Sequence, residues 1–111
     1  MTVRELVRDI QREIRDTDLL PDRAADLLTK LTALLGNIND EIREADQLYA
    51  MVLLAFLESD EAAARAKIRA EVSPEYQRKR EARDLKELAL ELIRSLKYFL
   101  RAKEEEMRLT R

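Results

Sequence analysis

The sequence predicts an all-α protein, a long helical hairpin with a short N-terminal helix and coiled-coil-like packing in an oligomer. Glycine occurs once and proline twice in 111 residues, and the abundance of Ala, Leu, Glu and Arg is typical of long helices. Charged residues make up 40% of the chain, which favours slender helices with much surface over a compact globule. The length suits a single helical domain over residues 1–111.

A short helix is expected over about residues 2–16. Its apolar residues recur every three or four positions and form one stripe, which consists of Val3, Leu6, Val7, Ile10 and Ile14. Pro21 then suits the first turn of a second helix, where Asp22 would lie at the positive end of the helix dipole.

The second helix is expected over residues 21–72 and carries the strongest periodic signal. Two of its heptad positions are apolar or aromatic over five heptads. The first position holds Ala24, Leu31, Ile38, Ala45 and Val52, and the other holds Leu28, Leu35, Ile42, Tyr49 and Phe56. From this set we expect the core or oligomer seam to consist of Leu28, Leu31, Leu35, Ile38, Ile42, Tyr49, Val52 and Phe56.

Two places in this helix are candidates for a break. One is the glycine and asparagine stretch near residues 36–40, although the heptad phase is unchanged across Gly36 and an interior glycine costs only about 1 kcal/mol. The other is near residue 59, where Ser59-Asp60 has the residue types that cap a new helix. Without a break the register continues through Ala63, Ala66 and Ala70, and small residues there would let a partner helix approach closely.

The last helix is expected over residues 74–108. Ser73 suits the N-cap and Pro74 the first helical position. Its apolar face consists of Leu85, Leu88, Ala89, Leu92, Ile93, Leu96, Phe99, Leu100 and Met107.

Charge is distributed unevenly, although the net charge is only −2. Residues 1–64 contain 7 Lys/Arg and 14 Asp/Glu, a charge of −7, whereas residues 65–111 contain 14 and 9, a charge of +5. Such asymmetry indicates either polyanion binding by the basic half or pairing between the two halves.

Eight bases of the last helix share one solvent-facing strip about 100° wide, which we call the basic strip. They are Lys79, Arg83, Lys86, Arg94, Lys97, Arg101, Arg108 and Arg111, and Tyr76 and Tyr98 border them. A cationic track with bordering aromatic residues is what single-stranded nucleic acid binding requires, since bases stack on the rings and cations neutralise phosphates.

Two other interpretations of the basic strip remain open. It is a plain solvated face if its bases pair with acids four residues away, as Arg83 can with Glu87 and Arg101 with Glu105. Alternatively, it binds an acidic protein.

The amino-acid composition offers little support for a catalytic function. The chain has no cysteine and no histidine, which excludes disulfides, the usual zinc sites and the commonest neutral-pH base. We therefore expect no enzyme, no catalytic residue, no metal site and no cofactor. Without a long apolar run or a signal-peptide pattern, we expect a cytoplasmic protein that does not bind membranes.

A remote enzymatic alternative rests on two acidic patches. They contain Asp40, Glu41 and Glu44, and then Glu81 and Asp84. These patches resemble the EExxE and ExxD motifs of MazG-like nucleotide pyrophosphatases, a resemblance that implies carboxylates holding Mg²⁺.

A second resemblance covers residues 40–111. It is carried by "ESDEAAARAKIRAEV", by "SPEY" at Ser73–Tyr76 and by "LIRSLKYFLRAKEEEMR" at Leu92–Arg108. This layout resembles small helical proteins of phage recombination modules, and more distantly the UvsY-type recombination mediators. The resemblance implies an oligomer that binds single-stranded DNA along the basic strip and helps to load a recombinase.

Two function hypotheses follow. The first is a non-enzymatic recombination accessory that binds single-stranded DNA and a recombinase partner. The second is a helical protein-protein interaction module, such as a phage inhibitor or assembly factor, without nucleic-acid binding. In either case the wide apolar stripe of residues 27–57 exceeds what one hairpin partner covers, so we expect a homo-oligomer.

Overall fold

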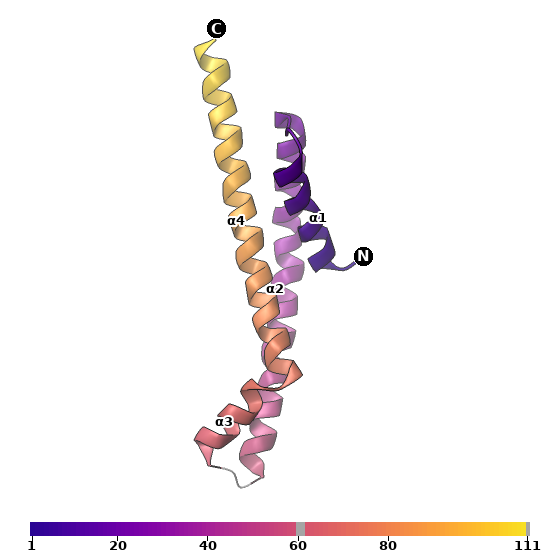
Figure 1. Cartoon of the computed structure of the whole chain (residues 1–111), viewed down its shortest axis with the longest axis vertical. Coiled ribbons are helices and arrows are strands. Elements are labelled where there is room, and N and C mark those ends of the chain that lie inside the picture. Colours follow the sequence, from indigo (N-terminus) through magenta and orange to yellow (C-terminus); the bar gives the residue numbers. More distant parts are fainter. Residues whose placement is uncertain (60–61, 111) are drawn as a thin grey trace. The chain divides into compact units, whose positions relative to one another are not determined.

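The computed structural model describes residues 1–59 and 62–110 and confirms the all-α fold class. Within these residues it contains four helices and no strand: α1 (Val3–Asp16), α2 (Pro21–Glu58), α3 (Ala63–Glu71) and α4 (Pro74–Leu109). The chain divides into two compact units, and α2 and α4 contribute to both of them. In each unit the segments of α2 and α4 run antiparallel, as the arms of a hairpin do (Figure 1).

Unit 1 consists of Met1–Asn37 and Leu85–Arg111 and is a three-helix arrangement of α1, the start of α2 and most of α4. Its core is apolar and draws on all three helices. The most deeply buried side chains are Val7 of α1, Leu27 and Leu31 of α2, and Leu96 of α4. The stripe that ends in Ile10 and Ile14 therefore faces the other helices, and the arginines of α1 lie on the opposite, exposed side.

Local hydrogen bonds fix both ends of α1. The Thr2 hydroxyl accepts a hydrogen bond from the Glu5 backbone N–H at 3.1 Å. At the other end the Thr17 hydroxyl donates to the Glu13 carbonyl oxygen at 2.6 Å. Such contacts satisfy backbone groups that the helix itself leaves unpaired.

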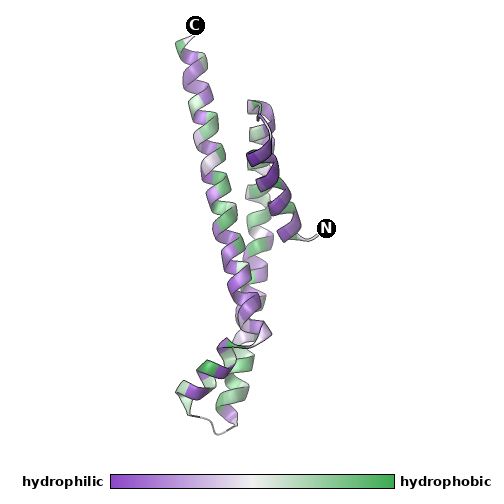
Figure 2. Cartoon of the chain, in the orientation of Figure 1, coloured by the Kyte–Doolittle hydropathy of each residue, from purple (hydrophilic) through white to green (hydrophobic). Residues whose placement is uncertain are grey.

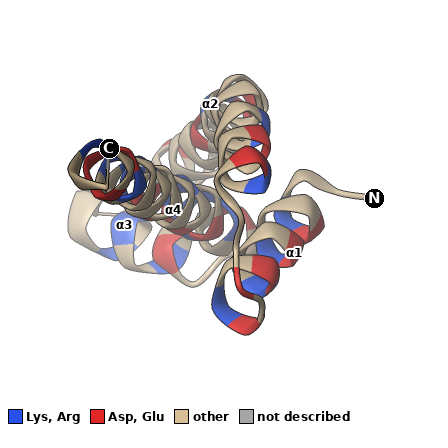
Figure 3. Ribbon diagram, turned by 90° about the horizontal axis from the view of Figure 1, so that it is seen from above, with Lys and Arg blue, Asp and Glu red and all other residues tan. Residues whose placement is uncertain are grey.

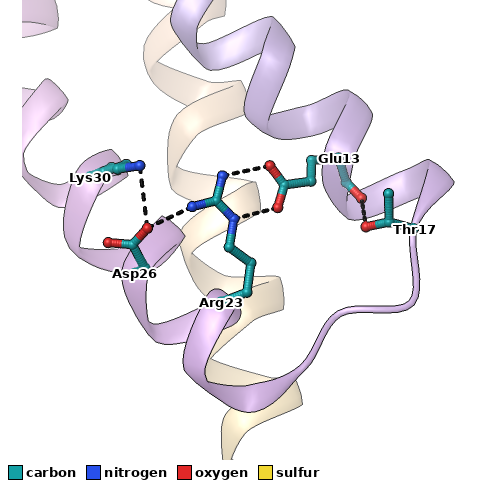
Figure 4. A network of polar contacts seen from close by, with 5 residues as sticks. All are labelled: Glu13, Thr17, Arg23, Asp26 and Lys30. Carbon is teal, nitrogen blue, oxygen red and sulfur yellow. Dashed lines mark hydrogen bonds and ion pairs between the residues drawn. The ribbon is translucent and has the colours of Figure 1, made fainter.

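An ion-pair network joins α1 to the start of α2 (Figure 4). Arg23 donates two hydrogen bonds to the Glu13 carboxylate, at 2.5 and 2.8 Å, and a third to Asp26 at 2.7 Å. Lys30 lies 3.2 Å from the same Asp26 carboxylate. The hydrogen bond from Arg23 lowers the pKa of Glu13. Because both contacts of the Arg23 guanidinium to Glu13 are charge-assisted and bidentate, they hold α1 in a defined position on α2.

Unit 2 consists of Ile38–Asp84, and alanines make up most of its buried residues, together with Ile38 and Tyr49. Ile38 and Ala45 of α2 are fully buried, as are Ala66 and Ala70 of α3. The predicted run of small residues is therefore used within the chain at Ala66 and Ala70, whereas Ala63 is exposed.

The expected helix over residues 21–72 is two helices. Helix α2 runs through Gly36 without interruption and ends at Glu58, so the break lies near residue 59. The Ser59 hydroxyl donates to the Phe56 carbonyl oxygen at 2.8 Å, which places Ser59 at the end of α2. The cap of α3 is Ala62, which makes no side-chain capping bond. Asp60, the other expected cap residue, lies outside the described residues.

The start of α4 has the predicted cap. The Ser73 hydroxyl accepts a hydrogen bond from the Tyr76 backbone N–H at 3.2 Å and donates to the Ala70 carbonyl oxygen at 2.5 Å. One hydroxyl thus ends α3 and begins α4, with Pro74 as the first helical residue.

Burial along α2 follows the heptad pattern. The first heptad position is fully buried at Ala24, Leu31, Ile38 and Ala45. At the other position Tyr49 is buried, whereas Leu28, Leu35, Ile42 and Phe56 are half-buried, as is Val52. Hydrophobic residues are concentrated on α2, whereas α1 is mostly hydrophilic (Figure 2).

Candidate nucleic-acid interface

The beginning of the basic strip, in unit 2, is occupied by contacts with α2. The ring of Tyr76 lies against that of Tyr49, with centroids 5.3 Å apart and planes tilted by 47°. The Lys79 ammonium lies 4.4 Å from the centre of the Tyr49 ring, a cation–π contact. Burial raises the pKa of Tyr49. Tyr76 and Lys79 are therefore half-buried and engaged within the chain.

Acidic residues of α2 bind two further bases near the start of α4, Arg83 of the strip and Arg78 beside it. Arg83 donates to Asp46 at 2.7 Å, and Arg78 lies 3.1 Å from Glu41 and 3.4 Å from Glu44. The hydrogen bond to Glu41 raises the pKa of Arg78. The opposite charges of the two halves thus meet inside unit 2, which is the intrachain form of the pairing that the charge asymmetry indicated.

The later bases of the strip belong to unit 1 and are more open. Lys86 is half-buried, whereas Arg94, Lys97, Arg101 and Arg108 are exposed. Two of these exposed bases pair with acids three residues before them. Arg94 lies 2.5 Å from Glu91, and Arg108 lies 3.4 Å from Glu105. Positive and negative residues both occur near the C-terminal end of α4 (Figure 3).

Lys97 and Arg101 differ from their neighbours on α4. Both are exposed, and neither forms an ion pair with any residue in the described part of the chain. The possible pair of Arg101 with Glu105 is not formed, and Glu105 contacts Arg108. Arg111, the last base of the strip, lies outside the described residues.

Tyr98 lies among these bases and is 74% exposed. On a helix it neighbours Arg94 four residues before and Arg101 three residues after, while Lys97 precedes it directly. We call these four residues the aromatic–basic patch: Arg94, Lys97, Tyr98 and Arg101. The sequence placed Tyr98 at the border of the strip, and the structure shows that its ring is far more accessible than that of Tyr76.

A second cationic surface lies on α1, and sequence reasoning missed it. A hollow of about 230 Å³ is lined by Arg8, Gln11, Arg12 and Arg15. The signal was present in the sequence, since arginines recur at positions 4, 8, 12 and 15, which share one side of a helix. We call this surface the arginine hollow.

An apolar face is exposed on unit 2. Met51 and Leu54 of α2 are 64% and 54% exposed, and Leu57 follows on the same side of the helix. Ile68 of α3 and Val72, the residue that follows α3, are also exposed. Exposed apolar groups that cluster in this way mark interaction surfaces.

Two of the acidic residues of the remote enzymatic alternative lie in ion pairs with α4. Glu41 and Glu44 bind Arg78. Within residues 1–59 and 62–110, no three acidic side chains lie close enough together to hold a metal ion. In the same residues no helix combines the length and the hydrophobicity that crossing a membrane requires.

Comparison with known proteins found no matching family, no curated relative and no similar solved structure.

Proposed function

We propose that the protein is a non-enzymatic helical accessory that binds single-stranded DNA through the aromatic–basic patch of α4. The observation that carries this proposal is the exposure of the Tyr98 ring beside Lys97 and Arg101, two cations without an ion pair among the described residues. Single-strand binding surfaces combine these two elements, because bases stack on an aromatic face while cations neutralise the phosphates.

Only the later part of the basic strip, beyond Arg83, is proposed to contact DNA. Tyr76, Lys79 and Arg83 hold α4 against α2, and their release for DNA would cost the contacts of unit 2. Lys86 and Arg108 flank the patch and extend the cationic surface along α4. A recombinase as protein partner follows from the resemblance to recombination-module proteins alone.

Replacement of Tyr98 tests the stacking component. Tyr98→Ala is expected to weaken binding of a fluorescent oligo(dT) by roughly 1–3 kcal/mol, because a base loses its aromatic platform. Tyr98→Phe keeps the ring and is expected to bind as the wild type does. Fluorescence anisotropy at low salt measures both. Equal affinity of Tyr98→Ala and the wild type would contradict the proposal.

A second candidate function is a helical protein-protein interaction module. The exposed apolar face of Met51, Leu54 and Leu57 favours it, because these side chains gain from burial against a partner. We propose a second copy of the chain as that partner, so that self-association accompanies DNA binding or replaces it. Light scattering, which measures the mass of the protein in solution, tests this candidate.

A further inference from the structure

The arginine hollow of α1 has the composition of an anion site. Three of its four lining residues are arginines, and the fourth, Gln11, adds a neutral amide donor. A guanidinium group offers several N–H donors in a planar fork, which matches the oxygens of a phosphate group. Among the residues that the structure describes, none that lines the hollow is acidic.

The partners that these arginines already have are weak competitors. Arg12 lies 3.5 Å from Asp9, and Arg15 contacts its neighbour Asp16 at 2.9 Å. All four of these side chains are about half exposed or more, and exposed pairs of this kind contribute little stability. Arg8 has no ion pair with any residue that the structure describes. A phosphate group can therefore take up these guanidinium groups at little cost.

The helix that carries the hollow is held in place. Val7 and Ile10 are buried on the side of α1 that faces the bundle. The acids of α1 follow its arginines by one residue, which sets them about 100° further around the helix. Among these acids, Glu13 is bound by Arg23 of α2. The fixed helix keeps the arginines on one side, so the backbone of the site needs no ordering when an anion binds, and only the side chains are immobilised.

We propose that the arginine hollow is a binding site for closely spaced phosphate groups. Arg8 and Arg12, one helical turn apart, bind the phosphate oxygens, and Gln11 and Arg15 complete the site. The phosphates come either from a free oligophosphate or from a nucleic-acid strand. The site does not depend on the aromatic–basic patch of α4, so either can fail without the other.

Inorganic tripolyphosphate is the first probe, and isothermal titration calorimetry at low salt measures its binding. The double variant Arg8→Gln/Arg12→Gln is expected to bind at least about tenfold more weakly than the wild type, since charge-assisted hydrogen bonds are lost. Arg43→Gln is a control for the loss of one paired surface arginine such as Arg12, because Arg43 also lies 3.5 Å from an aspartate three residues before it, Asp40. This control is expected to bind within about twofold of the wild type.

A second variant separates recognition by guanidinium groups from simple attraction of charge. Arg8→Lys/Arg12→Lys keeps both charges but loses the planar forks, and it is expected to bind more weakly than the wild type. Circular dichroism checks that every variant remains helical. The proposal is overturned by wild type that does not bind millimolar tripolyphosphate, or by either double variant binding it as tightly as the wild type.

Oligo(dT) titrations identify the source of the phosphates. If Arg8→Gln/Arg12→Gln loses affinity for both tripolyphosphate and oligo(dT), the hollow takes the phosphates of a strand. If only tripolyphosphate binding falls, the hollow takes a free oligophosphate. Wild type that binds tripolyphosphate through the hollow but fails to bind oligo(dT) would refute the proposed function and leave this site standing.

Discussion

Arg83 donates a hydrogen bond to the Asp46 carboxylate at 2.7 Å and thereby joins the start of α4 to the acidic stretch of α2. The sequence placed Arg83 in the basic strip as a contact for DNA, with Glu87 as its nearest helical partner. The structure gives it a partner 37 residues away instead. Asp46 is half-buried, and its second carboxylate oxygen is buried and has no hydrogen-bond partner among the residues that the structure describes. The contact with Arg83 therefore offsets part of the free-energy cost of burying this carboxylate.

Removal of this pair is expected to affect stability and not DNA binding. Arg83→Gln is expected to lower the free energy of unfolding by about 0.5–1 kcal/mol, a small value because both side chains are partly exposed. Urea denaturation measures this change, and a double-mutant cycle with Asp46→Asn isolates the pair. Oligo(dT) affinity is expected to remain within about twofold of the wild type. A large loss of DNA affinity with unchanged stability would indicate that Arg83 contacts DNA, as the sequence predicted.

Gly36 offers a test of the continuous α2 helix. It lies inside α2, and an added Cβ would meet no atom of the described residues within 4 Å. Gly36→Ala is therefore expected to raise the free energy of unfolding by roughly 0.5–1 kcal/mol, because alanine loses less backbone entropy in a helix. Thermal or urea unfolding measures the change. Destabilisation would indicate that the helix breaks at this glycine, or that a second chain packs closely against it.

Self-association is expected to use the apolar face of unit 2. Light scattering of the wild type at tens of micromolar is expected to give at least twice the mass of one chain. Leu54→Asp is expected to shift the mass toward that of one chain, because association would bury an unpaired carboxylate. Its helicity is expected to persist, since Leu54 is 54% exposed within the single chain. Wild type with the mass of one chain would contradict the oligomer.

Local patterns predicted much of the fold because helices are governed by short-range periodicity. Ala24, Leu31, Ile38 and Ala45 recur every seven residues and are all fully buried. Ser73 and Pro74 specified the start of α4 through capping chemistry that depends on neighbouring residues alone.

The end of α2 was harder to predict. The apolar register continues beyond residue 59 through the alanines, and a tertiary arrangement that periodicity does not encode decides between one helix and two. The sequence also could not predict which residues of the strip are engaged within the chain, since Tyr76 and Lys79 contact Tyr49, which is remote in sequence. Helical angles alone placed in one strip both the bases that contact α2 and the bases that are exposed to solvent. The distinction between Tyr76 and Tyr98 required the positions of both helices.

The central claim is that the cations around Tyr98, and not cations in general, bind the DNA backbone. Lys97→Gln/Arg101→Gln removes one lysine and one arginine from the patch, and Lys67→Gln/Arg80→Gln removes the same charges from exposed positions in unit 2. Glutamine is a comparable helix former, so both variants are expected to keep their helicity.

The most direct measurement is the salt dependence of oligo(dT) binding for the wild type and these two variants. The slope of log K against log salt is expected to become shallower by about 1.4 for Lys97→Gln/Arg101→Gln, or about 0.7 for each lost phosphate contact. For Lys67→Gln/Arg80→Gln it is expected to match the wild type. Equal slopes for the wild type and both variants, or wild type that does not bind oligo(dT) at low salt, would contradict the account.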